Sequence, residues 1–121
     1  ATSRGGQGGV LVNLSSIAAR LGGANMGVDY AGTKGAVEVM TRGLAAELAP
    51  EEIRVNAVRP GTIDTEIHEN WGVANWVRDI GPTIPAGRAG TADEAGEAIM
   101  WLLSDASSYV SGAILDVAGG R

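Results

Sequence analysis

The chain has 121 residues, of which 45% are hydrophobic, and a formal net charge of -5. These values indicate one small globular domain with enough apolar residues to form a core, and they argue against disorder. The basic residues are scattered, so no cluster is available to neutralise nucleic-acid phosphates, and we expect no nucleic-acid partner. The absence of cysteine and the single histidine, His68, argue against a transition-metal site built by the protein.

The sequence also argues against a membrane protein. No apolar run approaches the roughly 20 residues needed to span a bilayer, and the first residues lack the apolar stretch of a signal peptide. We therefore expect no membrane partner. A chain without cysteine is compatible with a reducing compartment, and we expect a cytoplasmic location.

The first predicted element is a buried strand at residues 10–14, an apolar run that contains β-branched side chains. Residues 1–9, with four glycines, look like the exit from a preceding element. Two hydroxyl side chains, Ser15 and Ser16, follow the strand directly. Residues 17–27 are rich in glycine and alanine, and we expect a loop there.

A helix is predicted next, from residue 28 or 29 to residue 49, with apolar side chains at helical spacing and Pro50 after its end. It carries Tyr30 and Lys34, the only lysine of the chain. Residues four apart share a helix face, and a nearby cation favours the ionised form of a phenol. Such a tyrosine could act as an acid or base near neutral pH. By itself, however, this spacing is equally compatible with an ordinary surface pair.

A second strand is predicted at residues 53–58, and it stops at Arg59, Pro60 and Gly61. The loop after it carries Thr62 and Thr65. Both strands would end at the same edge of a parallel sheet, and in open α/β sheets ligands bind at this carboxyl edge.

The remainder of the chain predicts a lid, a helix and a third strand. Residues 64–88 mix apolar side chains with glycine and proline, which indicates a flexible lid with short helices. Its tryptophans are equally compatible with a small satellite core and with an apolar substrate pocket. Thr91 and Glu94 form a capping box that starts a helix, and residues 113–117 form the last strand. This alternation of strands and helices predicts a parallel sheet with crossover connections.

Taken together and in this order, the motifs closely resemble the carboxyl-terminal half of short-chain dehydrogenases/reductases of the compact, single-domain type. The match covers nearly the whole chain and implies the corresponding half of a Rossmann-type, three-layer α/β domain over residues 1–121, with a substrate lid at about residues 65–88. The motifs are Asn13-Leu14-Ser15-Ser16, Tyr30-x-x-x-Lys34, the run from Asn56 to Gly61 with Thr65 after it, Gly87-Arg88, and Gly119-Gly120.

The resemblance implies an NAD(P)-dependent oxidoreductase that interconverts a secondary alcohol and a ketone or aldehyde. Tyr30 would exchange a proton with the substrate oxygen, Lys34 would assist Tyr30 and hold the nicotinamide ribose, and Ser16 would donate a hydrogen bond to the substrate oxygen. The nicotinamide carboxamide and a neighbouring phosphate would be held by Pro60, Gly61, Ile63 and Thr65. The choice between NAD and NADP and the identity of the small-molecule substrate cannot be read from the sequence.

Three departures from the family pattern stand out. Ser16 lies 14 residues before Tyr30, one more than the commoner spacing, which leaves Ser15 as the alternative serine. Ala118 stands where relatives often have an acidic residue. The glycine-rich nucleotide turn is missing, because the glycines of residues 1–9 precede a strand and not a helix. We expect this chain alone to be inactive, and to be part of a protein about twice as long or to fold with a partner that covers the first strand's open edge.

Two alternatives to the oxidoreductase remain at this stage. The first is a non-catalytic fragment that acts as an interaction module. The second, a serine hydrolase built on Ser15 or Ser16, is poorly supported, because there is no Gly-x-Ser-x-Gly motif and His68 has no evident carboxylate partner. The family resemblance also implies a homodimer or homotetramer, built partly on the helix that bears Tyr30 and Lys34.

Overall fold

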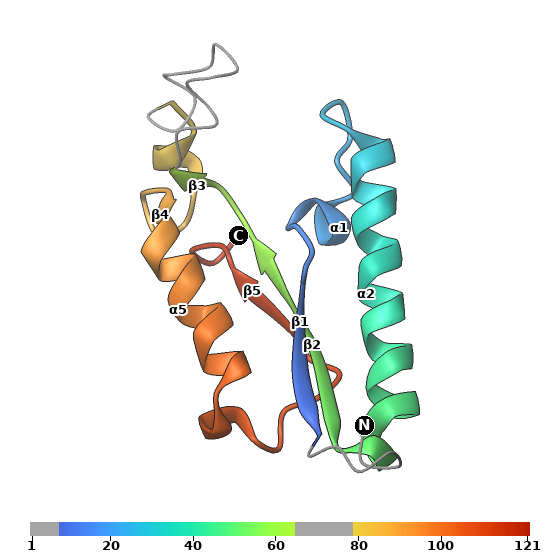
Figure 1. The fold of residues 1–121 in the computed structure, drawn as a ribbon. Helices are drawn as coiled ribbons and strands as arrows, with labels where there is room; N and C mark the ends of the chain where they lie inside the picture. The colour runs from blue at the N-terminus through green and yellow to red at the C-terminus, as the bar shows by residue number, and fades with distance from the viewer. Residues whose placement is uncertain (1–7, 65–78) are drawn as a thin grey trace.

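A computed structural model describes residues 8–64 and 79–121 of the chain (Figure 1). Its central sheet has three parallel strands in the order β1-β2-β5. Helix α2 (Val28–Leu48) packs on one face of this sheet, and helix α5 (Ala92–Leu103) covers the other. The fold is therefore the predicted Rossmann-like, three-layer α/β arrangement, and the three strands lie next to one another in one sheet. The strands are β1 (Gly9–Leu14), β2 (Ile53–Pro60) and β5 (Ile114–Val117).

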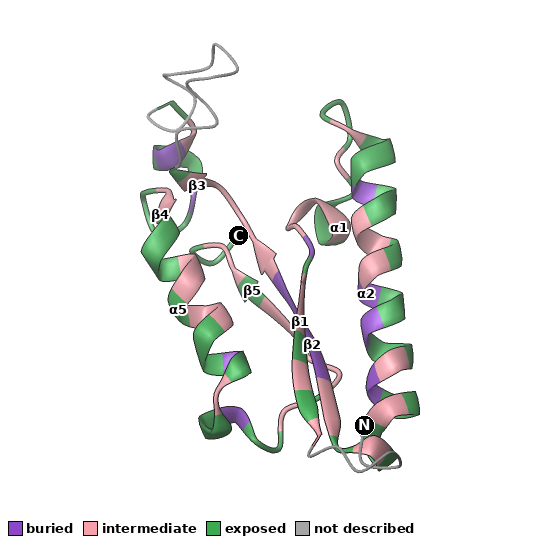
Figure 2. Ribbon diagram, in the orientation of Figure 1, coloured by how far each residue is buried: buried purple, intermediate pink, exposed green. Residues whose placement is uncertain are grey.

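Strand β2 lies at the centre of the sheet and forms the middle of the core (Figure 2). Val55, Ala57 and Val58 have no exposed surface, since neighbouring strands cover the backbone and helices cover both faces. Leu102 of α5 is buried on one side, and Thr41 of α2 on the other. Coverage of both faces explains why four successive residues of β2, positions 55–58, are buried and why burial does not alternate along the strand.

The helix ends follow the local sequence signals. Helix α2 passes into a 3-10 turn, η2 (Ala49–Glu51), at Pro50, where the sequence predicts that the helix ends. The capping box is confirmed: the Glu94 amide donates to Thr91 Oγ1 (3.1 Å), and the Thr91 amide donates to Glu94 Oε1 (3.0 Å). After α5, a second 3-10 turn, η4 (Asp105–Ser107), leads towards β5.

Three predicted boundaries were wrong. The expected loop at residues 17–27 contains a one-turn helix, α1 (Ala18–Leu21), which is too short to show a periodic pattern. Strand β2 continues through Arg59 and Pro60, because the Pro60 carbonyl still accepts a hydrogen bond, from the Ile17 amide (3.0 Å). Strand β5 begins at Ile114, since the Ala113 amide donates to the Asn56 side chain (3.0 Å) and not to a backbone carbonyl of β2.

The segment predicted to be a lid starts and ends at a small sheet that the sequence did not indicate. Strand β3 (Ile63–Asp64) pairs in parallel with β4 (Gly90–Thr91). Between them the structure describes residues 79–89, with a 3-10 turn, η3 (Gly81–Thr83). The rest of the predicted lid, including Thr65, His68 and both lid tryptophans, lies outside the described residues. No helix in the described part of the chain is long and apolar enough to cross a bilayer.

Candidate active site

The candidate site begins where β1 ends, at the carboxyl edge of the sheet. After the last residue of β1, the Ser15 amide donates to the Val58 carbonyl (2.8 Å) and the Ile17 amide donates to the Pro60 carbonyl (3.0 Å). The chain thus remains paired with β2 beyond the strand. Because side chains alternate along an extended backbone, adjacent Ser15 and Ser16 enter different surroundings.

The surroundings of the two serines favour Ser16 as the donor to a ligand. Ser15 is only 4% exposed, and its hydroxyl donates to Glu38 Oε2 over 2.5 Å, so its proton is already used. Ser16 is half-buried, and its hydroxyl oxygen accepts a hydrogen bond from the Ala18 amide (3.2 Å) at the start of α1. This contact leaves the Ser16 proton available, because a hydroxyl can accept and donate at once.

Tyr30 and Lys34 lie at the start of α2, beside the same edge. Lys34 reaches from the helix to the sheet, where its Nζ donates to the Leu14 carbonyl (3.1 Å). The same Nζ lies 5.7 Å from the centre of the Tyr30 ring. Tyr30 itself is 51% exposed. The predicted pair therefore adjoins the end of β1, with a cation beside an accessible phenol.

The end of β2 contributes the next predicted residues. The Gly61 amide donates to the Val117 carbonyl (2.9 Å), directly after Pro60. A Cβ atom on Gly61 would lie 2.8 Å from the Ala118 Cβ, a separation that real Cβ atoms essentially never show. Glycine is thus required by the close approach of two strand ends. Ile63 lies farther along, in β3, and the structure does not describe Thr65.

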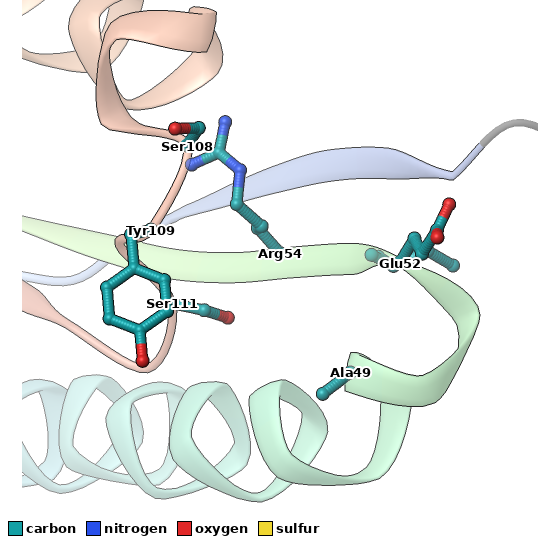
Figure 3. A pocket seen from close by; sticks show the side chains of 7 residues that line it. Ala49, Glu52, Arg54, Ser108, Tyr109 and Ser111 are labelled. Atoms are coloured by element: carbon teal, nitrogen blue, oxygen red, sulfur yellow. The ribbon is translucent and has the colours of Figure 1, made fainter.

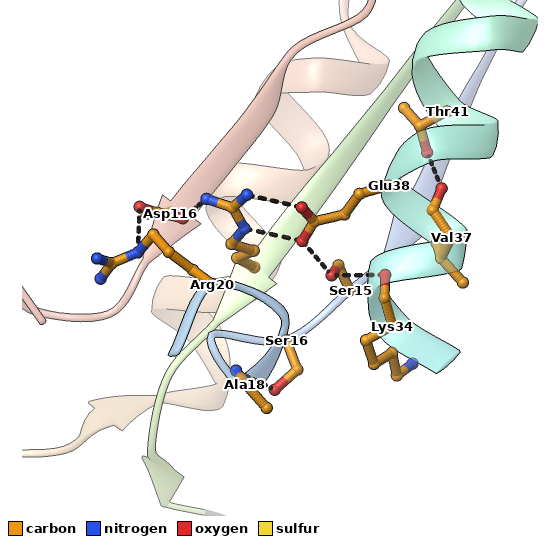
Figure 4. Close-up of polar contacts among 10 residues, drawn as sticks. Ser15, Ser16, Ala18, Arg20, Lys34, Val37, Glu38, Thr41 and Asp116 are labelled. Atoms are coloured by element: carbon orange, nitrogen blue, oxygen red, sulfur yellow. Dashed lines mark hydrogen bonds and ion pairs between the residues drawn. The ribbon is translucent and has the colours of Figure 1, made fainter. Parts of the chain in front are cut away.

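An ionic network behind these residues was missed by the sequence analysis (Figure 4). Arg59 donates to both oxygens of Glu38, with Nε–Oε2 at 2.8 Å and Nη2–Oε1 at 2.6 Å. Arg59 also donates to Asp116 of β5 (3.1 Å), which pairs in turn with Arg20 of α1 (3.5 Å). Arg20 additionally donates to the Arg121 carbonyl. The network joins α1, α2, β2 and β5 at the carboxyl edge.

The network also sets the charge state of its buried carboxylate. The hydrogen bonds from Arg59 lower the pKa of Glu38 against the opposing effect of burial, and the Ser15 hydroxyl lowers it further. The pKa of Arg59 is raised, chiefly by its hydrogen bonds to Glu38. Two features of the sequence are compatible with this pair: Glu38 lies four residues after Lys34 in the predicted helix, and Arg59 directly follows the predicted strand at residues 53–58.

The opposite, amino edge of the sheet has a hollow of about 530 Å³ (Figure 3). Arg54, which lines this hollow, donates to the carbonyls of Ser104 (3.1 Å), Ser107 (2.8 Å) and Val110 (3.2 Å). Arg54 therefore ties the segment after α5 to β2. The hollow is lined by Ala49, Glu52, Ile53, Arg54, Ser108, Tyr109 and Ser111.

The chemistry of the carboxyl edge fits the nicotinamide end of a dinucleotide. The Lys34 ammonium has three donors, of which one is used on Leu14. An accessible phenol and a serine hydroxyl with a spare proton lie at the same edge. No group of three or more histidine, cysteine, aspartate or glutamate side chains that could hold a metal ion occurs within residues 8–64 and 79–121.

The fold and these side chains define a Rossmann-like α/β protein with tyrosine, lysine and serine at the ligand-binding edge. A family profile described as enoyl-(acyl carrier protein) reductase matches residues 2–121. The uncharacterized oxidoreductase YgfF of Escherichia coli (strain K12) is 50% identical over the whole chain, which spans 49% of that relative. The chain therefore belongs to the short-chain dehydrogenase/reductase family, whose members are oxidoreductases that generally use NAD or NADP.

Solved structures agree with this assignment. A short-chain type dehydrogenase/reductase from Mycobacterium ulcerans matches with a TM-score of 0.82 and 37% identity, over 97% of this chain and 42% of that protein. A 3-oxoacyl-[acyl-carrier protein] reductase from Brucella melitensis matches with a TM-score of 0.83 and 41% identity, over 92% of this chain and 41% of that protein. The chain thus spans half or less of the length of these relatives.

Proposed function

We propose that this chain supplies the catalytic half of an NAD(P)-dependent oxidoreductase that interconverts an alcohol and its ketone or aldehyde. The observation that carries the proposal is the position of Lys34. Its ammonium is anchored on the Leu14 carbonyl at the carboxyl edge and lies 5.7 Å from the ring of an exposed tyrosine. A phenol beside a fixed cation is suited to exchange a proton with a substrate oxygen.

Each of the three polar side chains has a distinct task in this proposal. In the direction of reduction, the Tyr30 hydroxyl gives its proton to the carbonyl oxygen as that oxygen gains negative charge. The Lys34 ammonium stabilises the phenolate that remains. The Ser16 proton, which no contact in the site engages, donates to the same substrate oxygen and stabilises the charge that develops there.

The dinucleotide would be held at its nicotinamide end by Lys34, by Pro60 at the end of β2, and by Gly61, Ile63 and Thr65 in the segment after it. When bound, the nicotinamide supplies or accepts the hydride. Because Gly61 has no Cβ atom, this segment can pass close to Ala118 where the backbone leaves the sheet. The described residues include no glycine-rich turn between a strand and a helix, so the adenine end needs a further part of the protein.

We propose that this further part pairs with β1. Strand β1 lies at the edge of the three-stranded sheet, and Leu11 and Leu14 on it are half-exposed although the strand is apolar. An apolar edge strand is normally covered. Leu11→Asp should therefore weaken the association of the two halves, which can be measured as a loss of cofactor affinity in the complete protein. An unchanged affinity would contradict this placement.

The test of the catalytic assignment is Tyr30→Phe in the complete protein, with acetoacetyl-coenzyme A, 2,3-butanedione and glyceraldehyde as carbonyl probes. Removing the phenolic proton should lower turnover by about 10²- to 10⁴-fold and leave cofactor binding intact. The matched control is Tyr109→Phe, because Tyr109 is exposed at the opposite edge of the sheet. This control should turn over normally.

Two outcomes would count against the proposal. Retained turnover in Tyr30→Phe would exclude Tyr30 as the proton donor. Failure of the complete wild-type protein to bind NADH or NADPH, measured by the fluorescence of the reduced nicotinamide, would instead favour the non-catalytic interaction module.

A further inference from the structure

We propose that Glu38 and Arg59 are positioning residues, which hold Ser16 and Lys34 in place by clamping the end of β1 to α2. This inference rests on the proposed function and deepens it. Glu38 belongs to none of the motifs that identify the family in the sequence, and Arg59 lies in the run from Asn56 to Gly61 without a role assigned to its side chain. Neither residue is placed to touch the substrate. Their action passes through Ser15.

This clamp between β1 and α2 is a bidentate ion pair between Arg59 and Glu38, and it is largely shielded from solvent. The Arg59 guanidinium donates to both carboxylate oxygens of Glu38, and the exposed fractions of the two side chains are 15% and 6%. Paired, charge-assisted hydrogen bonds of this kind fix direction as well as distance. Arg59 is held from its other side by Asp116 (3.1 Å), so the guanidinium has a defined orientation.

Ser15 transmits this fixed geometry to the site. Its hydroxyl donates to Glu38, and its amide donates to the β2 residue next to Arg59 (2.8 Å). Ser15 is thus held between α2 and β2. The residue before it, Leu14, offers the carbonyl that anchors the Lys34 ammonium, and the residue after it is Ser16. A displacement of Ser15 would therefore move both the lysine anchor and the serine donor.

The energetics argue that the pair has more than a stabilising task. A buried ion pair commonly contributes no more stability than well-packed apolar side chains of the same volume, because both ions lose their hydration. What the ion pair offers here is direction, at the one place where β1, β2 and α2 meet beside the candidate site. Small displacements of catalytic groups are costly: a shift of about 1 Å can reduce a rate roughly 100-fold.

The same strand supplies a matched control. Arg54, near the other end of β2, is also part-buried and donates to three backbone carbonyls and to the Ser107 hydroxyl. Its removal also costs several hydrogen bonds. Those bonds tie down the segment after α5, at the amino edge of the sheet, far along β2 from Ser15.

The experiment compares Arg59→Met, Glu38→Gln and Arg54→Met in the complete protein, with 2,3-butanedione and NADPH or NADH, well below each variant's Tm. We expect Arg59→Met to lower kcat about 10- to 100-fold with a smaller change in KM. Glu38→Gln retains an acceptor for Ser15 and should lose less. Arg54→Met should lower Tm but keep kcat within about twofold, because its contacts do not reach the site.

Hydrogen exchange gives a readout that does not depend on turnover. The amides of Ser15 and Ile17 are bonded to β2 carbonyls, and we expect them to exchange at least about tenfold faster in Arg59→Met but not in Arg54→Met. Unchanged exchange, or equal losses of kcat in the two arginine variants, would overturn the positioning role. If the wild-type protein has no turnover, the proposed function fails, and the exchange comparison alone decides whether the clamp holds the end of β1.

Discussion

The two ends of strand β2 carry the same kind of side chain but use it differently. Near the amino edge, Arg54 donates to neutral carbonyls and a hydroxyl in the segment after α5. Near the carboxyl edge, Arg59 donates to two carboxylates on different elements. Each edge also has an exposed tyrosine, Tyr109 and Tyr30 respectively. Within the described residues, a cation lies over the tyrosine ring only at the carboxyl edge.

This difference shows that the presence of a hollow is a poor guide to chemistry. The hollow of about 530 Å³ lies at the amino edge, where Arg54 donates to three backbone carbonyls and holds the segment after α5. The carboxyl edge has an anchored ammonium with unused donors and a serine proton that is available. Unused donors, held in fixed positions, make an edge of the sheet reactive.

The largest effect that would sharpen this comparison is expected from replacing Ser16 at the carboxyl edge. Ser16→Ala should lower kcat about 10²- to 10³-fold, because a donor to the developing negative charge is lost. At the amino edge, Ser111→Ala removes the acceptor of the Val55 amide (3.1 Å) and should cost about 1–3 kcal/mol of stability while kcat is unchanged. Steady-state kinetics and urea unfolding of both variants measure this. A kinetic defect in Ser111→Ala would break the comparison.

The next effect concerns the close approach of strand ends at the carboxyl edge. Gly61→Ala should cost about 1–3 kcal/mol, because its Cβ would lie 2.8 Å from the Ala118 Cβ and the strand ends must separate. Gly43→Ala in α2 meets nothing within 4 Å and should stabilise by about 0.5–1 kcal/mol. Urea unfolding of the two variants provides the test. Equal effects would show that Gly61 is not sterically constrained.

A smaller effect is expected in the pH dependence of stability. Arg59 lowers the pKa of Glu38 below its unfolded value of about 4.3, and Arg42 and the Ser15 hydroxyl act in the same direction. The stabilisation is therefore complete above about pH 5 and is lost as the pH falls through the folded pKa. The free energy of unfolding, measured from pH 7 down to pH 3, should fall less steeply in Glu38→Gln than in the wild type. Identical profiles would contradict a paired Glu38.

The smallest effect is expected at the exposed pair beside β4. Hydrogen bonds from Arg88 lower the pKa of Glu94 to about 2. The stabilisation from this pair is therefore also lost as the pH falls, here between about pH 4.5 and 2. However, both side chains are largely in solvent, which screens the interaction. Glu94→Gln should thus change the pH profile less than Glu38→Gln does, and the same unfolding series measures it. A larger change would reverse the ranking of the two pairs.

Much of the fold could be predicted because its signals are local. Strand β1 is an apolar run, β2 has β-branched residues before a Pro-Gly pair, α2 has helical spacing before a proline, and the capping box at Thr91 is a short motif. The parallel alignment of the strands follows from the alternation of strands and helices along the chain. The short elements α1, β3 and β4 could not be found this way, because four or two residues show no period and depend on distant partners.

The candidate site divides in the same manner. Tyr30 and Lys34 are four residues apart, so helix geometry alone brings them together, and their position at the end of β1 follows from the sheet. The choice of Ser16 over Ser15 required the surroundings of each hydroxyl. From the sequence, Ser16 was assigned by the family resemblance alone, with Ser15 as the alternative.

The chain's residues thus specified a Rossmann-like sheet, its ligand-binding edge and a tyrosine and lysine beside it, because those features depend on hydrophobic period and short spacing. The link from Asp116 through Arg59 and Glu38 to Ser15 depended on folding. Members in direct contact are separated by as many as 57 positions, and a contact over such a distance exists only once the strands have paired and α2 has packed on them.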